Sequence, residues 1–131
     1  MNPQEFLDVM AETANKHDFV AHMNLISKDV KVYGLPDFEE INYDDWYNQC
    51  QKEFKDMLLL RVSYHGLHIL AEAPDRIMFA AVEIAEASDG HENVYGIEFT
   101  IQKEDDGQWR VVQERILPEA KLDDETSKAL Q

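Results

Sequence analysis

The chain has 131 residues, of which 44% are hydrophobic and 30% are charged, so it can form one globular domain with a hydrophobic core. Acidic residues outnumber basic ones 27 to 12, which gives a formal net charge of −15. Nucleic acids and anionic membranes are bound mainly through Lys and Arg, and a surface this acidic repels both. We therefore expect neither kind of partner.

Cysteine content and the absence of targeting signals narrow the class of protein further. Cys50 is the only cysteine, which excludes an intramolecular disulfide and a metal site built from several thiolates. Residues 1–5 lack the basic and apolar run of a secretion signal. No apolar stretch approaches the roughly 20 residues that span a bilayer. The sequence predicts a cytoplasmic protein.

Helix signals dominate the first half of the chain. Asn2 followed by Glu5 is typical of a capped helix start, and apolar residues at helical spacing predict a helix over residues 3–15. Asp18 can cap a second, short helix, and a short strand is expected at residues 30–33. The buried side of the second helix is expected to carry Phe19, Met23 and Ile26. A third helix begins at Asn42, and its buried face carries Trp46, Cys50, Phe54 and Met57.

From Leu58 onward the pattern changes to strands separated by turn residues. The expected strands are 58–72, 77–87, 93–103 and 108–117. The last residues are polar and acidic, so residues 1–118 form the predicted single domain and 119–131 a loose tail. The predicted fold class is α+β, with the N-terminal helices packed on a curved antiparallel sheet.

The turns also predict which side chains share a face of the sheet. Loops at residues 88–92 and around Gly107 would place Glu83, Ile97 and Arg115 in one row, on the face that the helices cover. The turn at Pro74 would place Gly66 opposite Glu83 and His68 opposite Ala81, on the same face. The other face is also apolar, through Met78, Val82, Ile84, Val94 and Val112. Because helices can cover only one face, we expect a homodimer through this outer face.

The order of elements, ending in Asp106-Gly107-Gln108-Trp109-Arg110-Val111, resembles the nuclear transport factor 2-like superfamily, with its SnoaL-like and ketosteroid isomerase-like cone folds. The resemblance covers about residues 4–117. It implies a cone-shaped, cystatin-like α+β roll that encloses an apolar pocket, often with a dimer interface on the outer sheet face. The superfamily includes isomerases, dehydratases, cyclases and binding modules, so the fold does not fix a reaction.

Glu83 is the first candidate catalytic residue, because it lies in the apolar segment 78–85. Burial would raise the pKa of its carboxyl toward the range of a general base. Arg115, in the same predicted row, would either bind an anionic substrate or neutralise Glu83. His68 is the second candidate catalytic residue, and the alternative for it is a hydrogen-bonded residue of the core.

Candidate ligand-binding side chains are Tyr64, Arg115, Tyr95, Gln113, Tyr33 and Trp46. Histidine spacing fits no metal site, since His65 and His68 point to opposite faces of a strand, and no cofactor motif is found. The sequence thus predicts a cofactor-independent isomerase, dehydratase or cyclase for a small apolar or mixed-polarity ligand. The alternative is a non-catalytic ligand-binding or dimerisation module of the same fold.

Overall fold

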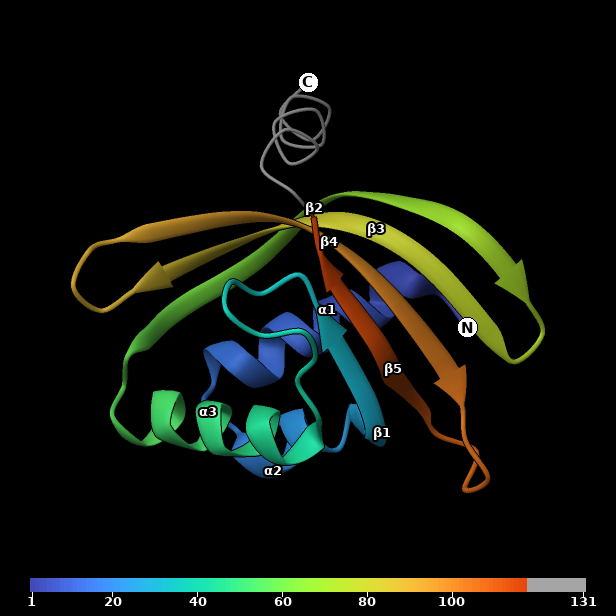
Figure 1. The fold of residues 1–131 in the computed structure, drawn as a ribbon, viewed down its shortest axis with the longest axis horizontal. Coiled ribbons are helices and arrows are strands. Elements are labelled where there is room, and N and C mark those ends of the chain that lie inside the picture. Colours follow the sequence, from blue (N-terminus) through green and yellow to red (C-terminus); the bar gives the residue numbers. More distant parts are fainter. Residues whose placement is uncertain (118–131) are drawn as a thin grey trace.

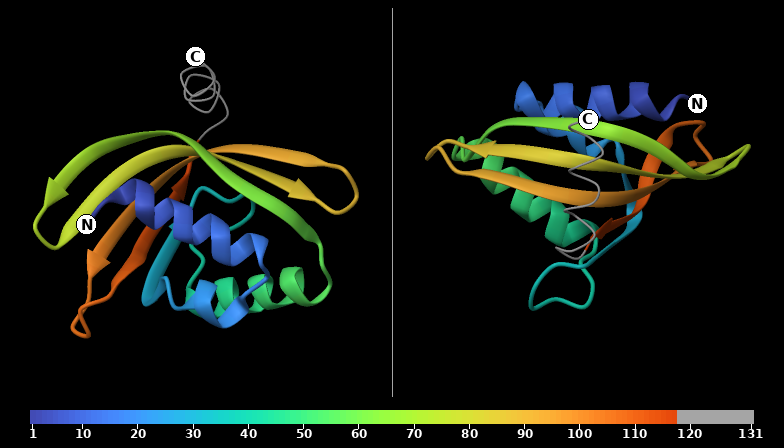
Figure 2. Two further views of the ribbon diagram at one scale, coloured as in Figure 1. Left: turned by 180° about the vertical axis from the view of Figure 1, so that it is seen from behind. Right: turned by 90° about the horizontal axis from the view of Figure 1, so that it is seen from above.

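The computed structural model describes residues 1–117 and shows three helices beneath the concave side of a strongly curved sheet (Figures 1 and 2). The elements are α1 (Pro3–Asn15), α2 (Phe19–Met23), β1 (Ile26–Tyr33), α3 (Tyr43–Lys55), β2 (Leu59–Ala73), β3 (Arg76–Ala87), β4 (Glu92–Lys103) and β5 (Trp109–Ile116). The α+β class is as predicted. The tail expected at residues 119–131 lies outside the described residues. No helix within residues 1–117 combines the length and apolarity needed to cross a bilayer.

The three helices begin at the predicted capping residues. The Asn2 side chain accepts hydrogen bonds from the backbone N–H groups of Gln4 and Glu5. Asp18 caps α2, and Asn42 forms a reciprocal capping box with Asp45 at the start of α3. These side chains satisfy backbone donors that have no partner within a helix.

Two predicted element boundaries are wrong. Ile26 does not belong to α2 but begins β1, four residues before the predicted strand start at 30. Met57 does not extend the buried face of α3, because the helix ends at Lys55 and Met57 has a φ of 55° and is 57% exposed. In both cases a helical spacing of apolar residues continues past the point where the backbone leaves the helix.

The sheet has the strand order β1-β5-β4-β3-β2, and β1 pairs with β5 in parallel. The four strands of the second half pair antiparallel as predicted, and the short first strand, for which the sequence predicted no partner, adds a parallel edge. A parallel pair needs a long crossover connection, and the chain between β1 and β5 supplies one. The pattern of a single short strand does not reveal its partner.

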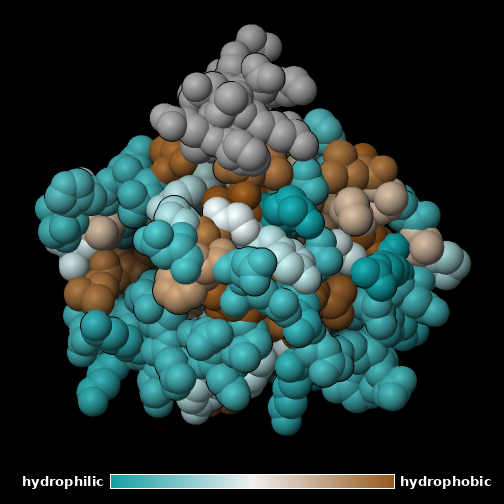
Figure 3. Space-filling view, in the orientation of Figure 1, coloured by the Kyte–Doolittle hydropathy of each residue, from teal (hydrophilic) through white to brown (hydrophobic). Residues whose placement is uncertain are grey.

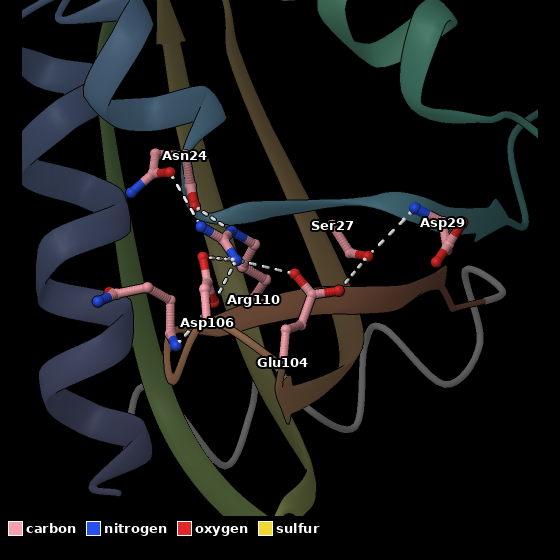
Figure 4. Close-up of polar contacts among 7 residues, drawn as sticks. Asn24, Ser27, Asp29, Glu104, Asp106 and Arg110 are labelled. Carbon is pink, nitrogen blue, oxygen red and sulfur yellow. Dashed lines mark hydrogen bonds and ion pairs between the residues drawn. The ribbon is translucent and has the colours of Figure 1, made fainter.

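Arg110 ties the start of β5 to the junction between α2 and β1 (Figure 4). Its Nε donates to the Asn24 backbone carbonyl at 2.9 Å, and its Nη1 lies 3.0 Å from Glu104 and 2.9 Å from Asp106. Ser27, at the start of β1, donates its hydroxyl to Glu104 at 2.8 Å. This cluster holds the β4–β5 turn against β1 and so favours the parallel pairing.

The hydrophobic core lies between α1 and the concave face of the sheet. Leu7 and Met10 of α1 are almost fully buried, as are Phe79 of β3 and Phe99 of β4. The centroids of the two phenylalanine rings lie 5.6 Å apart. Full burial of such a side chain contributes about 1.5–3 kcal/mol to stability, so this layer is a main source of the fold's free energy.

A β-bulge at Val112 changes which residues of β5 face the helices. Ile101 pairs with Val111 as predicted, but Thr100 pairs with Gln113, so one extra residue is inserted into β5. Beyond it every side chain has the opposite orientation. Phe99 therefore pairs with Glu114, not with Gln113, and the predicted row that joined Ile97 to Arg115 is wrong.

A second bulge does the same in β2. His65 pairs with Val82 and His68 with Ala80, so Gly66 and Leu67 together lie opposite Ala81. Gly66 has a φ of 66°, in the left-handed region that glycine adopts without strain. His68 is consequently on the outer face and exposed, and its predicted place on the inner face is wrong.

The third register difference leaves the faces unchanged. Glu83 pairs with Tyr95 where the sequence suggested Ile97, and with Tyr64 where it suggested Gly66. The β3–β4 turn is tighter than expected, since the backbone N–H of Ala87 donates to the carbonyl of His91 at 2.8 Å. Both shifts are by two residues, so Glu83 still faces the helices as predicted.

Candidate functional site

A cavity of about 470 Å³ lies between the helices and the concave side of the sheet, within the usual range for small-molecule sites. Its wall is mostly apolar, and hydrophobic side chains are visible between hydrophilic ones beneath the arch of the sheet in Figure 3. Side chains from all three helices and all five strands contribute to it. The lining includes Met10, Trp46, Cys50, Phe54, Val62, Tyr64, Glu83, Tyr95, Phe99, Glu114 and Ile116.

Three polar side chains enter this cavity from the sheet. Tyr64 of β2 and Glu83 of β3 are directly opposite each other across the strand pair, and the Tyr64 hydroxyl donates a hydrogen bond to the Glu83 carboxylate. Glu114 of β5 pairs with Phe99 of β4 and is only 9% exposed. Glu83 is half-buried, and it lines the cavity together with Glu114.

Burial raises the pKa of both carboxyl groups. The pKa of Glu83 rises to about 6, because desolvation and the charge of Glu53 outweigh the hydrogen bond from Tyr64. The pKa of Glu114 rises to about 8, through desolvation and then through the charge of Glu83. The two groups titrate as a pair, and near neutral pH the two glutamates hold one proton between them. An acid and a base thus face one apolar cavity.

Tyr64 stays neutral beside this pair. Burial raises the pKa of its hydroxyl well above the ordinary value of 10, and the charges of Glu83 and Glu114 add to the effect. The hydroxyl is therefore a hydrogen-bond donor at any physiological pH. Its bond to Glu83 favours the ionised form of that carboxyl and fixes its orientation.

Two other titratable side chains in the wall are poor acids, bases or nucleophiles. Burial raises the pKa of the Cys50 thiol to about 12, so little reactive thiolate forms. Burial lowers the pKa of His22 to about 4, so the imidazole is neutral. Its Nδ1 lies 2.8 Å from the Thr13 hydroxyl, which orients the ring within the core.

The structure brings half of the predicted site residues into the cavity. Glu83, Tyr64, Tyr95 and Trp46 line it. Those that do not line it are His68, Arg115, Gln113 and Tyr33. Arg115 lies on the exposed side of β5, where its guanidinium is 5.2 Å from the centre of the Tyr33 ring. The expected Glu83–Arg115 pair is therefore wrong.

Glu114 is the functional candidate that sequence reasoning missed. Gln113, Glu114 and Arg115 are consecutive polar residues, so only the strand register says which of them points inward. The bulge at Val112 turns Gln113 and Arg115 away from the cavity and Glu114 into it. The sequence showed only that either Glu114 or the pair Gln113 and Arg115 points inward, and nothing in it decided between these two registers.

No family model and no curated protein matches the sequence. Solved structures do. An NTF-2-like protein of unknown function from Shewanella oneidensis has a TM-score of 0.71 and 15% identity, with 86% of this chain and 93% of that chain covered. The chain has the NTF2-like fold. A candidate scytalone dehydratase from Novosphingobium aromaticivorans has a TM-score of 0.65 and 13% identity, over 86% of this chain and 78% of the other.

The same fold occurs within a longer protein. The chain matches Bd1075 of Bdellovibrio bacteriovorus with a TM-score of 0.64 and 13% identity, over 88% of its own length, but spans only 40% of that chain. At these identities the likeness establishes the NTF2-like architecture alone. Any reaction must be argued from the cavity and its side chains.

Proposed function

We propose that the protein binds a small, largely apolar molecule in this cavity and transfers a proton on it without a cofactor, as an isomerase, dehydratase or cyclase. The observation that carries the proposal is that Glu83 and Glu114, whose pKa values are both raised by burial, line the same apolar cavity. Environments that push the pKa values of two acids apart are a recurring sign of acid–base catalysis. The similarity to a candidate scytalone dehydratase supports the same kind of chemistry.

Each polar group has a role in such a reaction. Glu83 is the base that removes a proton from carbon, and Tyr64 holds its carboxylate in place. Glu114 is the acid that donates a hydrogen bond or a proton to the oxygen on which negative charge develops. The apolar wall excludes water, which strengthens both interactions.

A non-catalytic module would be better supported if aromatic side chains filled the cone. Phe79 is fully buried below the surface of the cavity, and Phe99 forms part of its wall, yet about 470 Å³ stays open. Several polar groups reach this open volume, which favours the ligand-binding enzyme.

We also propose that the molecule forms a homodimer through the outer sheet face. Met78, Ile84 and Val94 lie on the convex side, opposite the helices, and keep part of their apolar surface exposed. Burial of such a face in a symmetric pair would remove this surface from water.

Exchange of carbon-bound hydrogen tests the catalytic proposal. The protein would be incubated in D₂O with a panel of small cyclic ketones and enones, and deuterium incorporation followed by NMR. Glu83→Gln is expected to reduce exchange by about 10²–10⁴-fold, because a general base is lost. Glu72→Gln, at an exposed position of β2 outside the cavity, is the matched control. Unchanged exchange in Glu83→Gln would refute the assigned base.

A further inference from the structure

The charged side chains that line the cavity all have the same sign. Asp45, Glu53, Glu83 and Glu114 contribute carboxyl groups, and within residues 1–117 no Lys or Arg contributes to the lining. His22 is in the wall but neutral, since burial lowers its pKa to about 4. The wall therefore offers no cation to an anionic ligand, and any charge that it gains is negative.

Glu114 points independently to a missing partner. The side chain is nine-tenths buried, and within residues 1–117 its carboxyl makes no side-chain hydrogen bond. Its oxygens are still accessible from the cavity, since no buried polar atom of the described chain is cut off from every partner and from solvent. A buried polar group in this situation is stabilised by whatever donor enters the cavity.

A donor that carries positive charge fits this wall better than a neutral one. A cation near both carboxyls makes charge-assisted hydrogen bonds, about twice as strong as neutral ones. Trp46 and Tyr95 add aromatic faces that attract cations. The net charge of −15 draws cations toward the molecule from a distance.

An organic cation fits this cavity better than a metal ion does. A divalent metal needs several oxygen or nitrogen ligands at about 2–2.6 Å. Residues 1–117 contain no group of three or more His, Cys, Asp or Glu side chains that could hold one. Most of the remaining wall is apolar, as a hydrocarbon body requires.

We propose that the ligand of this pocket is an apolar molecule bearing a protonated amine, whose ammonium group lies in the part of the cavity that Glu83 and Glu114 both face. The inference rests on the proposed function, because it names the class of molecule on which the same pair acts. The hydrocarbon part packs against α1 and α3. The ammonium group pairs with the ionised carboxyl, and the two glutamates keep the proton that the proposed reaction needs.

Three matched probes test the charge preference: 2-phenylethylamine, 2-phenylethanol and 3-phenylpropanoate. Isothermal titration near neutral pH is expected to show the amine bound at least about 10-fold more tightly than the alcohol, with no binding of the acid. Below about pH 5 the preference should shrink, since Glu83 and Glu114 are then mostly protonated.

Variants test whether the carboxyl groups of the cavity cause the preference for the amine. Glu83→Gln is expected to abolish the preference, while Glu72→Gln leaves it unchanged; circular dichroism checks that each variant is folded. Equal or tighter binding of the alcohol, with exchange activity that still depends on Glu83, would overturn the amine inference and leave the proposed function standing. If no probe binds at millimolar concentration and no ketone exchanges, both are refuted.

Discussion

Replacement of Glu114 by glutamine is expected to stabilise the protein at neutral pH and to leave its stability unchanged in acid. The carboxyl has an ordinary pKa of 4.5 in the unfolded chain and about 8 in the folded one. Between these values the folded state binds more protons than the unfolded state, so the free energy of unfolding falls as the pH rises. Glutamine has nearly the same shape but never ionises, and it removes this dependence.

The size of the effect follows from the difference between the two pKa values. Each pH unit in this interval costs about 1.4 kcal/mol, so the wild type loses about 3 kcal/mol between pH 4.5 and pH 7 through this one group. Glu114→Gln should recover an amount of that order near pH 7 and nothing below pH 4.5. Because Glu114 makes no side-chain hydrogen bond within residues 1–117, the substitution breaks none.

Urea unfolding at a series of pH values measures this directly, because the free energy of unfolding extrapolates linearly from denaturant. Glu72→Gln is the control, since that carboxyl is exposed and outside the cavity. A wild-type stability that stays flat or rises between pH 5 and pH 8 would refute the reasoning. A Glu114→Gln variant that is less stable than the wild type at pH 8 would refute it too.

Three further predictions concern neighbouring features. Tyr64→Phe removes the donor to Glu83, so the pKa of Glu83 should rise further in a carboxyl NMR titration; a lower pKa would contradict the assigned hydrogen bond. Arg110→Ala leaves Glu104 and Asp106 without their cation (Figure 4) and should cost about 1–3 kcal/mol in urea unfolding, whereas an unchanged midpoint would show that the cluster stabilises nothing. Ile84→Lys should convert a dimer of about 30 kDa into a 15.2 kDa monomer in sedimentation, and a wild type that is already monomeric refutes the dimer.

Local signals in the sequence were sufficient for the helix starts and the four long strands of this fold. Asn2, Asp18 and Asn42 cap the three helices where expected, because a cap depends on residues only two or three positions away. The four long strands also begin and end within two residues of their predicted bounds. The parallel partner of β1 could not be found in this way, since it depends on contacts between Arg110 and a segment more than 80 residues away.

The site depends on register, and register errors differ in their consequences. A shift of two residues placed Glu83 beside Tyr95 in place of Ile97, yet kept it inside the cone, because side chains alternate with a period of two. A shift of one residue exchanged Arg115 for Glu114 and moved His68 to the outer face. Gly66 indicated the bulge in β2, since glycine within a strand often marks a bulge. No residue type at Val112 indicated the bulge in β5.

The single extra residue in β5 decides the chemistry of the cavity. Without it, Arg115 would face Glu83, and a buried ion pair would hold two fixed charges with no proton to donate. With it, Glu114 enters the cavity and Arg115 lies outside beside Tyr33. Two acids in one apolar site cannot both ionise at low cost, so one of them keeps its proton. The acid and the base of the proposed reaction therefore arise from one arrangement, in which the bulge at Val112 turns a second carboxyl toward the first.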